Sequence, residues 1–296
     1  YSTEGGWDPH TERLLGTWMD PNFVAGMLGF MIPIMLGKWY DSTSWKERTW
    51  LGGLILLCLY ALFLTFSRSG YLSASIGLFL FFIFRDPKVI LIGIIASGIG
   101  IMANERAQKR VTELAGTISS IVFQDTDEID PTAKLRIVSW KKSFDLFVKY
   151  PILGIGYNTY RYRAAEEGIV DESYHSAGGS DSTHLTVLVT TGAIGAMFFV
   201  FFVATLFFLN FGRYFTYLPP FVGEGETNRY LHIKRKAIFL GFASGFLSLF
   251  FHAVFVNSLF FPLIFMVVMA VAGVLEAIYN GPKNKRLAPQ PVVPGL

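Results

Sequence analysis

Long apolar runs alternate with short polar segments along most of the chain. The runs lie at about 22–40, 50–66, 71–84, 89–103, 185–211, 237–256 and 259–279. A helix needs roughly 17–25 residues to cross a hydrocarbon core about 30 Å thick, and several of these runs are near that lower limit. The pattern predicts about seven membrane-spanning segments.

These runs predict helices rather than strands. They lack the apolar/polar alternation of barrel strands, and a helix satisfies its own backbone hydrogen bonds in lipid. The third and fourth runs are separated only by Arg85-Asp86-Pro87-Lys88, four residues that cannot sit in lipid, which predicts a tight helical hairpin. The expected fold is an all-α polytopic helical bundle that forms one membrane domain over residues 1–296.

Basic residues indicate how the bundle is oriented. Lysines and arginines gather in 38–50, 85–88, 212–236 and the tail after 279. With seven spans, all four segments fall on one face, which the positive-inside rule makes cytoplasmic. Segment 104–184, between the fourth and fifth spans, and segment 1–21 are then extracytoplasmic. An outer N-terminus without a signal sequence predicts a fragment that lacks an odd number of upstream spans, in a multi-pass protein of the cytoplasmic (inner) membrane.

Segment 104–184 contains the signature of an amphipathic helix. Asp130-Pro131 resembles an N-cap followed by proline at the first helical position. Apolar residues then recur at roughly helical spacing as far as Lys149, at Leu135, Val138, Phe144 and Phe147. We expect this helix to lie on the outer face of the bundle, followed by a flexible turn at Gly154-Ile155-Gly156.

Composition agrees with a membrane protein and excludes several other classes. Apolar residues make up 52% of the chain and charged residues only 16%, against about a quarter in soluble domains. The net charge of +3 is too small and too scattered for nucleic-acid binding. The histidines lack metal-ligand spacing, and no Walker-type phosphate loop is present, so neither a metal nor a cofactor is expected.

Two arginines are candidates for anion binding. Arg68 stands between two apolar runs, where an arginine usually faces a bundle interior or an aqueous cavity. A planar guanidinium suits phosphate oxygens, and an arginine that snorkels to lipid headgroups is the alternative explanation of the position. Arg136 lies in the first turns of the amphipathic helix, where an ordinary solvated charge is the simpler interpretation.

Asp181 and His184 precede the fifth run and are candidates for proton transfer. A carboxylate or imidazole at the membrane surface can take the proton from an attacking hydroxyl. Asp181 is equally explained as a helix cap, because aspartate is favoured there. His175 and His252 are further candidates that are more simply explained as structural residues.

Five short motifs in order resemble the O-antigen ligase and polymerase superfamily, membrane glycosyltransferases of the type-C class. They are residues 16–22 (GTWMDPN), 65–70 (TFSRSG), 135–140 (LRIVSW), 150–160 (YPILGIGYNTY) and 185–195 (LTVLVTTGAIG). The resemblance covers about Gly16 to Gly273. It implies transfer or polymerisation of glycan from an undecaprenyl-diphosphate-linked donor to a glycan or lipid acceptor, on the outer side of the membrane. Inversion at the anomeric carbon without a metal is expected.

The resemblance also implies roles for individual residues. Arg68 and Arg136 match the family's membrane-border and loop arginines, which hold the carrier diphosphate. Ligases typically carry His-Asn four residues before the leucine that matches Leu185, whereas this chain has Asp181-Ser182 there and His184 further on. The aspartate is more similar to the polymerase and exopolysaccharide branch, and it leaves Asp181 or His184 as the base.

Two other classes of protein fit part of the sequence. A transporter or channel would explain polar groups inside spans, but it predicts paired half-helices or inverted repeats, which the sequence does not indicate. A non-catalytic membrane scaffold would leave Arg68 and Arg136 without a role. Accumulation of undecaprenyl-linked oligosaccharide on gene deletion is required only by the transferase.

Overall fold

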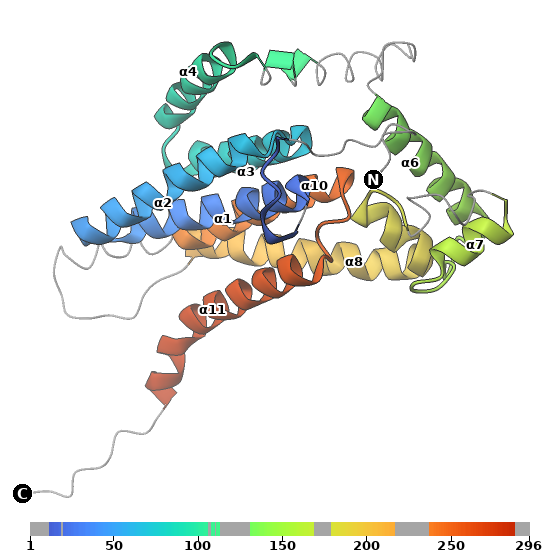
Figure 1. Ribbon diagram of the computed structural model, residues 1–296. Helices are drawn as coiled ribbons and strands as arrows, with labels where there is room; N and C mark the ends of the chain where they lie inside the picture. Colours follow the sequence, from blue (N-terminus) through green and yellow to red (C-terminus); the bar gives the residue numbers. More distant parts are fainter. Residues whose placement is uncertain are drawn as a thin grey trace, which may run out of the picture.

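The computed structural model describes residues 12–18, 20–105, 108–109, 111–112, 131–168, 179–216 and 237–287. The regular elements of this part of the chain are all helices (Figure 1). They are η1 (Gly16–Trp18), α1 (Pro21–Asp41), α2 (Trp45–Leu64), α3 (Arg68–Arg85), α4 (Lys88–Met102), α6 (Pro131–Lys149), α7 (Tyr160–Glu166), α8 (Thr183–Thr216), α10 (Ala237–Phe255) and α11 (Pro262–Leu287). The all-α fold is confirmed.

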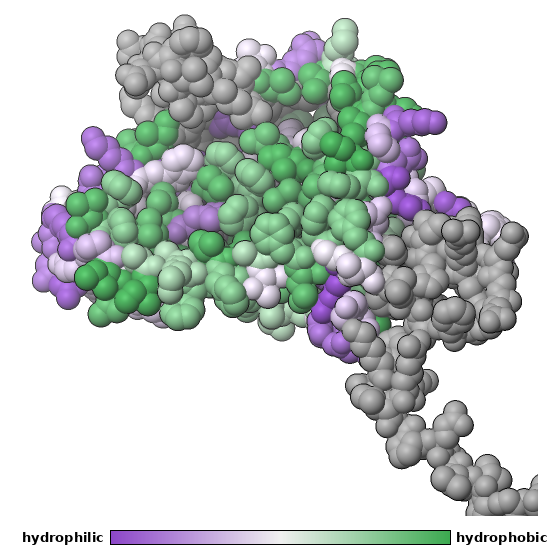
Figure 2. All heavy atoms as spheres, turned by 180° about the vertical axis from the view of Figure 1, so that it is seen from behind, coloured by the Kyte–Doolittle hydropathy of each residue, from purple (hydrophilic) through white to green (hydrophobic). Residues whose placement is uncertain are grey.

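Five helices are long and apolar enough to cross a membrane, namely α1, α2, α8, α10 and the apolar part of α11, Pro262–Asn280. Hydrophobic residues form a broad band over one face of the bundle, and hydrophilic residues gather towards its ends (Figure 2). Helices α3 and α4 have 18 and 15 residues, and they meet at the polar tetrapeptide as predicted. Because neither reaches the length and hydropathy of the other five, the count of seven spans stays a prediction.

Small residues let α1, α3 and α10 approach one another closely at the centre of the bundle. Gly37 of α1 packs against α10, where a Cβ would lie 2.5 Å from the Ala237 carbonyl oxygen. Gly241 and Gly245 of α10 lie directly against carbonyl groups of α1. In lipid, helices associate through such close packing rather than through the hydrophobic effect. These contacts make α10 the most buried of the five candidate spans.

Helix α8 consists of two arms that meet at Gly192, whose backbone is not helical (φ 64°, ψ −168°). The rings of His184 in the short arm (residues 183–191) and Phe199 in the long arm (residues 193–216) are 5.7 Å apart. In a straight helix, 15 residues would separate their backbones by about 22 Å. The short arm therefore bends back towards the long arm, whereas the apolar run at 185–211 suggested one continuous span.

Four backbone hydrogen bonds join the connection between α6 and α7 to the residues on either side of the break in α8. They run from Ile155 N to Val189 O (3.0 Å), Gly156 N to Thr190 O (2.9 Å), Ala193 N to Pro151 O (2.8 Å) and Ile194 N to Ile152 O (3.4 Å). A broken helix is tolerated at a membrane only when its freed backbone groups are satisfied. The 151–156 turn does this for both arms, and we call these four bonds the backbone clasp.

Two glycines make the clasp possible. Gly154 (φ 70°) and Gly192 adopt a left-handed backbone that favours glycine. A Cβ at Gly154 would lie 2.5 Å from the Gly192 nitrogen. The predicted turn at Gly154-Ile155-Gly156 is therefore present, but the structure shows it fixed against α8.

We expect Gly154→Ala to destabilise the protein by more than Gly168→Ala. Gly168 has a similar φ of 64° but open space around its Cα. The Gly168 variant thus isolates the free-energy cost of placing an alanine in the left-handed backbone region, about 1–2 kcal/mol. The Gly154 variant adds steric overlap worth about 1–3 kcal/mol. Thermal unfolding of the purified protein measures both, and equal losses would mean that the clasp contact contributes nothing.

Helices α6 and α7 lie across one end of the bundle (Figure 1). The predicted helix is present as α6, although its proposed cap, Asp130, lies outside the described residues, and its place on the outer side of the membrane stays a prediction. Its buried face centres on Ser143 and Leu146, whereas Val138 and Phe144 of the predicted apolar face are 40% and 53% exposed. The ring of Trp140 lies 6.0 Å from that of Phe255, at the end of α10.

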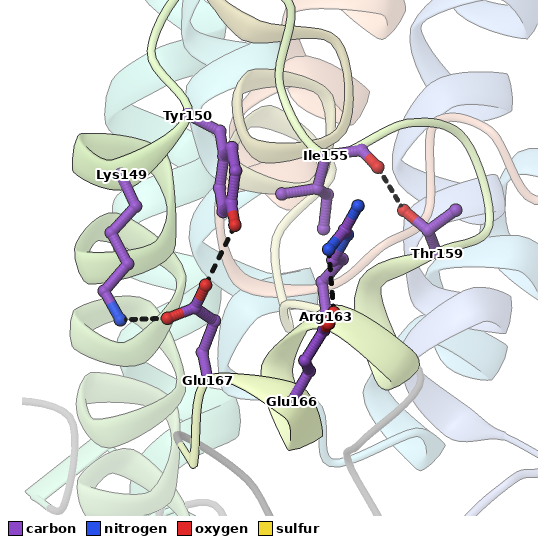
Figure 3. Close-up of polar contacts among 7 residues, drawn as sticks. All are labelled: Lys149, Tyr150, Ile155, Thr159, Arg163, Glu166 and Glu167. Atoms are coloured by element: carbon purple, nitrogen blue, oxygen red, sulfur yellow. Dashed lines mark hydrogen bonds and ion pairs between the residues drawn. The ribbon is translucent and has the colours of Figure 1, made fainter.

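A polar cluster joins α6 to the residue that follows α7 (Figure 3). Glu167 pairs with Lys149 and accepts a 2.9 Å hydrogen bond from the Tyr150 hydroxyl. The Lys149 ammonium holds the pKa of Glu167 below its usual value. The carboxylate in turn raises the pKa of the Tyr150 phenol. Helices α6 and α7 therefore form one unit, which the clasp attaches to α8.

Candidate functional site

Segments that are distant in sequence meet at the end of the bundle beneath α6, which we call the site pole. They are the start of α1, the α2–α3 turn, the end of α10 and the start of α8. Hydrogen bonds and ring contacts connect each of these segments to a neighbour. Arg68, Arg136 and Asp181 all lie in these segments or in α6.

The α2–α3 turn fixes the position of Arg68. Phe66 adopts a positive φ of 46°, which reverses the chain sharply before α3. The Ser67 side chain then caps α3 by accepting a hydrogen bond from Gly70 N (3.2 Å). It also donates to Asn22 Oδ1 of α1 (2.8 Å). Arg68 is thus the first residue of a capped helix that is tied to α1, and its side chain is partly buried.

A second set of contacts holds the same turn from the N-terminal segment. Arg13 Nε donates to the Thr65 carbonyl (2.8 Å), and Leu14 N donates to the Leu64 carbonyl (2.9 Å). These bonds satisfy carbonyl groups at the end of α2, which have no partner within their own helix. The reversal before Arg68 is therefore held from two sides.

His252 connects the start of α3 to Arg136. Its side chain is completely buried, with Nε2 3.5 Å from Ser69 Oγ and Nδ1 2.9 Å from Ser258 Oγ. The Arg136 guanidinium is close enough to this ring to interact with it electrostatically. Trp140, one turn after Arg136 in α6, also packs against Phe255 at the end of α10, which places Arg136 at the same pole as the residues that flank Arg68.

Asp181 lies directly before the short arm of α8. Ser182 caps this arm by accepting a hydrogen bond from Leu185 N (3.4 Å). Burial raises the pKa of the Tyr160 phenol, its hydrogen bond with Ser143 lowers it, and the nearby Asp181 carboxylate adds to the rise. Asp181 is only partly buried.

His184 occupies a different environment from Asp181. Its ring lies edge-on to Phe250, with centroids 4.5 Å apart, and also contacts Phe199. Both ring nitrogens are buried, and neither makes a hydrogen bond with acceptable geometry within the described residues. The imidazole therefore packs among aromatic rings instead of facing an aqueous surface.

Several residues of the site pole were not predicted from the sequence. Asn22, Ser67, Ser69 and Ser258 are small polar residues within or beside apolar runs, and their contacts are non-local. Two of these serines flank Arg68 in the TFSRSG motif, which is the one sequence signal that pointed to them. His175 lies outside the described residues. Within the described residues, no group of histidines, cysteines and carboxylates is arranged to hold a metal ion.

Comparison with known proteins gives one match. A family model described as O-Antigen ligase matches residues 53–200, which is half of the chain. The matched segment includes Arg68, Arg136 and Asp181 and extends past the break in α8. Neither the curated proteins nor the solved structures contain a match.

Proposed function

The chain belongs to the O-antigen ligase family, and we propose that it transfers or polymerises glycan from an undecaprenyl-diphosphate-linked donor. The reaction would take place on the outer side of the cytoplasmic membrane, with a glycan or lipid as acceptor. Family membership indicates a glycosyltransferase-like activity in a multi-pass membrane protein. The finer assignment rests on the chemistry of the site pole.

The observation that supports this proposal is that the segments that carry two arginines and a carboxylate lie at one end of an apolar bundle. Arg68 comes from α3, Arg136 from α6, and Asp181 precedes α8. Guanidinium groups bind phosphate oxygens in a bidentate manner, so they suit a lipid diphosphate. A partly buried carboxylate nearby suits deprotonation of an acceptor hydroxyl.

These groups are sufficient for a single displacement step. The acceptor oxygen forms a bond to the anomeric carbon of the donor sugar while the bond from that carbon to the phosphate oxygen breaks. The acceptor proton passes to Asp181, and the electron pair leaves with the diphosphate. Arg68 and Arg136 stabilise the charge that develops on this leaving group. Attack from the opposite side would invert the anomeric configuration.

An apolar groove starts one turn below Arg68 and suits the lipid tail of the donor. It has a volume of about 650 Å³ and lies between α3 and α4. Leu72, Ile76 and Phe79 of α3 line one wall, and Val89 and Ile94 of α4 line the other. A polyprenyl chain in this groove would place its diphosphate beside Arg68, at the start of the same helix.

The proposal is tested with purified protein in lipid nanodiscs and an undecaprenyl-diphosphate-linked oligosaccharide. We expect one undecaprenyl diphosphate to be released for each new glycosidic bond, with an inverted linkage detected by NMR. A chelator should not change the rate. Release of the lipid without a new glycosidic bond would instead indicate a hydrolase.

A transporter or channel remains the alternative, because α8 contains a broken helix of the kind that transporters use. Transporters usually pair such a helix with a second one in a repeat. Among the described helices, only α8 has non-helical backbone angles in its interior. Glycan flux across proteoliposomes without a change in the lipid carrier would favour the transporter.

The distribution of basic groups supports placing the site pole outside. Three arginines at the opposite end each lie over an aromatic ring at 4.2–4.7 Å, namely Arg48 on Trp39, Arg85 on Tyr40 and Arg213 on Tyr279. Such cation–π contacts hold positive charge at that end of the bundle. The positive-inside rule then makes that end cytoplasmic.

We expect Tyr157→Cys to react with a membrane-impermeant maleimide in intact cells and Thr43→Cys to react only after the membrane is opened. Both positions are exposed, and they lie at opposite ends of the bundle. The native Cys58 is replaced by serine so that each variant has a single thiol. Labelling of Thr43→Cys or of cysteines in 212–236 in intact cells would reverse the orientation.

A further inference from the structure

His252 is a buried histidine that the proposed reaction does not use. It lies one turn before the end of α10, and its side chain has no exposed surface. A neutral imidazole carries one donor nitrogen and one acceptor nitrogen. Here each nitrogen faces a serine hydroxyl, that of Ser258 on one side and that of Ser69 on the other. Both polar atoms of the ring are therefore used.

The contacts of His252 continue across the bundle as a network of polar side chains. Ser69 Oγ lies 3.2 Å from Ser67 Oγ, which in turn donates to Asn22. This polar network thus joins the start of α1, the start of α3, the end of α10 and the turn that contains Ser258. Such buried networks specify one arrangement of the elements that they connect when every member is satisfied.

In the sequence, Arg68 lies between Ser67 and Ser69, two serines of this polar network. Ser67 caps the helix in which Arg68 is the first residue, and Ser69 is the one that contacts His252. The same imidazole is within electrostatic reach of Arg136. His252 therefore contacts the residue beside Arg68 and interacts electrostatically with Arg136.

We propose that His252 is a positioning residue that holds Arg68 beside Arg136, so that both arginines engage one diphosphate. This inference rests on the proposed function, because it concerns how the donor is held. His252 does not touch the donor itself, since its ring is fully buried. It acts through Ser69 and the first turn of α3.

Replacement of His252 separates positioning from a purely structural role. We expect His252→Leu, which fills similar space without hydrogen bonds, to lower kcat/KM for the lipid-linked donor at least tenfold. His252→Gln, which keeps one donor and one acceptor, should recover part of this loss. KM for the acceptor should stay within twofold. Lower thermal stability with unchanged donor kinetics would show a structural role only and overturn the inference.

Ser258→Ala and Ser244→Ala form a matched pair that avoids large changes in volume. Both serines are fully buried, but only Ser258 contacts His252, and Ser244 Oγ has no hydrogen-bond partner within the described residues. We expect Ser258→Ala to weaken donor kinetics in the same direction as His252→Leu, and Ser244→Ala to match the wild type. This pair remains informative if His252→Leu does not fold, and equal behaviour of the two variants would overturn the inference.

A double-mutant cycle with Arg68→Lys shows whether His252 acts through Arg68. If it does, His252→Leu should cost much less in the Arg68→Lys background than in the wild type. If the loss in the double variant equals the product of the losses in the two single variants, the residues act independently and the positioning role is overturned. A fully active Arg68→Lys would instead refute the diphosphate role of Arg68 and with it the proposed function. An impaired Arg68→Lys beside a normal His252→Leu would refute the positioning role alone.

Discussion

Asp181→Asn is expected to insert and fold normally but to transfer glycan about 10²–10⁴-fold more slowly, the usual contribution of a general base. Asparagine keeps the size of aspartate and removes only the basic carboxylate. Because Ser182 provides the cap of the short arm of α8, the substitution should leave that helix intact. Transfer from a lipid-linked donor, measured with the purified variant, reports the loss directly.

His184→Gln is the comparison for this experiment. The imidazole packs against Phe250 and Phe199 with both nitrogens buried, so we expect its replacement to lower stability more than turnover. Normal turnover by Asp181→Asn together with an inactive but folded His184→Gln would identify the histidine as the base. The register of the family motif, which places Asp181 where ligases carry histidine, would then be misleading.

Arg68→Lys and Arg136→Lys are expected to lose most of the transferase activity. Lysine retains the positive charge but cannot make the paired hydrogen bonds of a planar guanidinium to phosphate oxygens. Loss of a charged hydrogen bond costs about 1.5–3 kcal/mol, which corresponds to a reduction of roughly 10–150-fold in kcat/KM for the donor. Steady-state kinetics at saturating acceptor measure this effect.

Arg163→Lys is a suitable control for the arginine variants. Arg163 belongs to α7 and pairs with Glu166 at an exposed position (Figure 3). An exposed pair of this kind contributes at most about 1 kcal/mol to stability, and lysine preserves its charge. We expect wild-type kinetics for this variant. Equal losses in all three variants would mean that the loss of a guanidinium anywhere near the membrane impairs the protein, and would contradict a specific diphosphate site.

Most helix boundaries were predictable because lipid imposes strict rules on sequence. The tetrapeptide Arg85-Asp86-Pro87-Lys88 separates α3 from α4 as expected, and Pro131 starts α6. The break in α8 was not predicted. Its cause is a left-handed glycine together with a turn about 40 residues upstream, and neither alters the apolar pattern from which the span was inferred.

The candidate site was predictable where the chemistry is unusual for a membrane. Charged groups such as Arg68 and Asp181 stand out beside apolar runs, and the structure places their segments at one pole. The serines around His252 do not stand out, because a single serine in a transmembrane helix is common. His252 itself was interpreted as structural, and its link to both arginines depends on contacts among α1, α3, α6 and α10 that only the folded chain reveals.

The backbone clasp also constrains the order in which the protein can assemble during synthesis. Residues 151–156 bind residues 189–194, so the ribosome releases the first partner well before the second. Until α8 is made and inserted, the backbone groups of the turn that form the clasp have only water as a partner. We therefore expect α6 and α7 to wait undocked at the membrane surface and to become resistant to protease only after the long arm of α8 has crossed the bilayer.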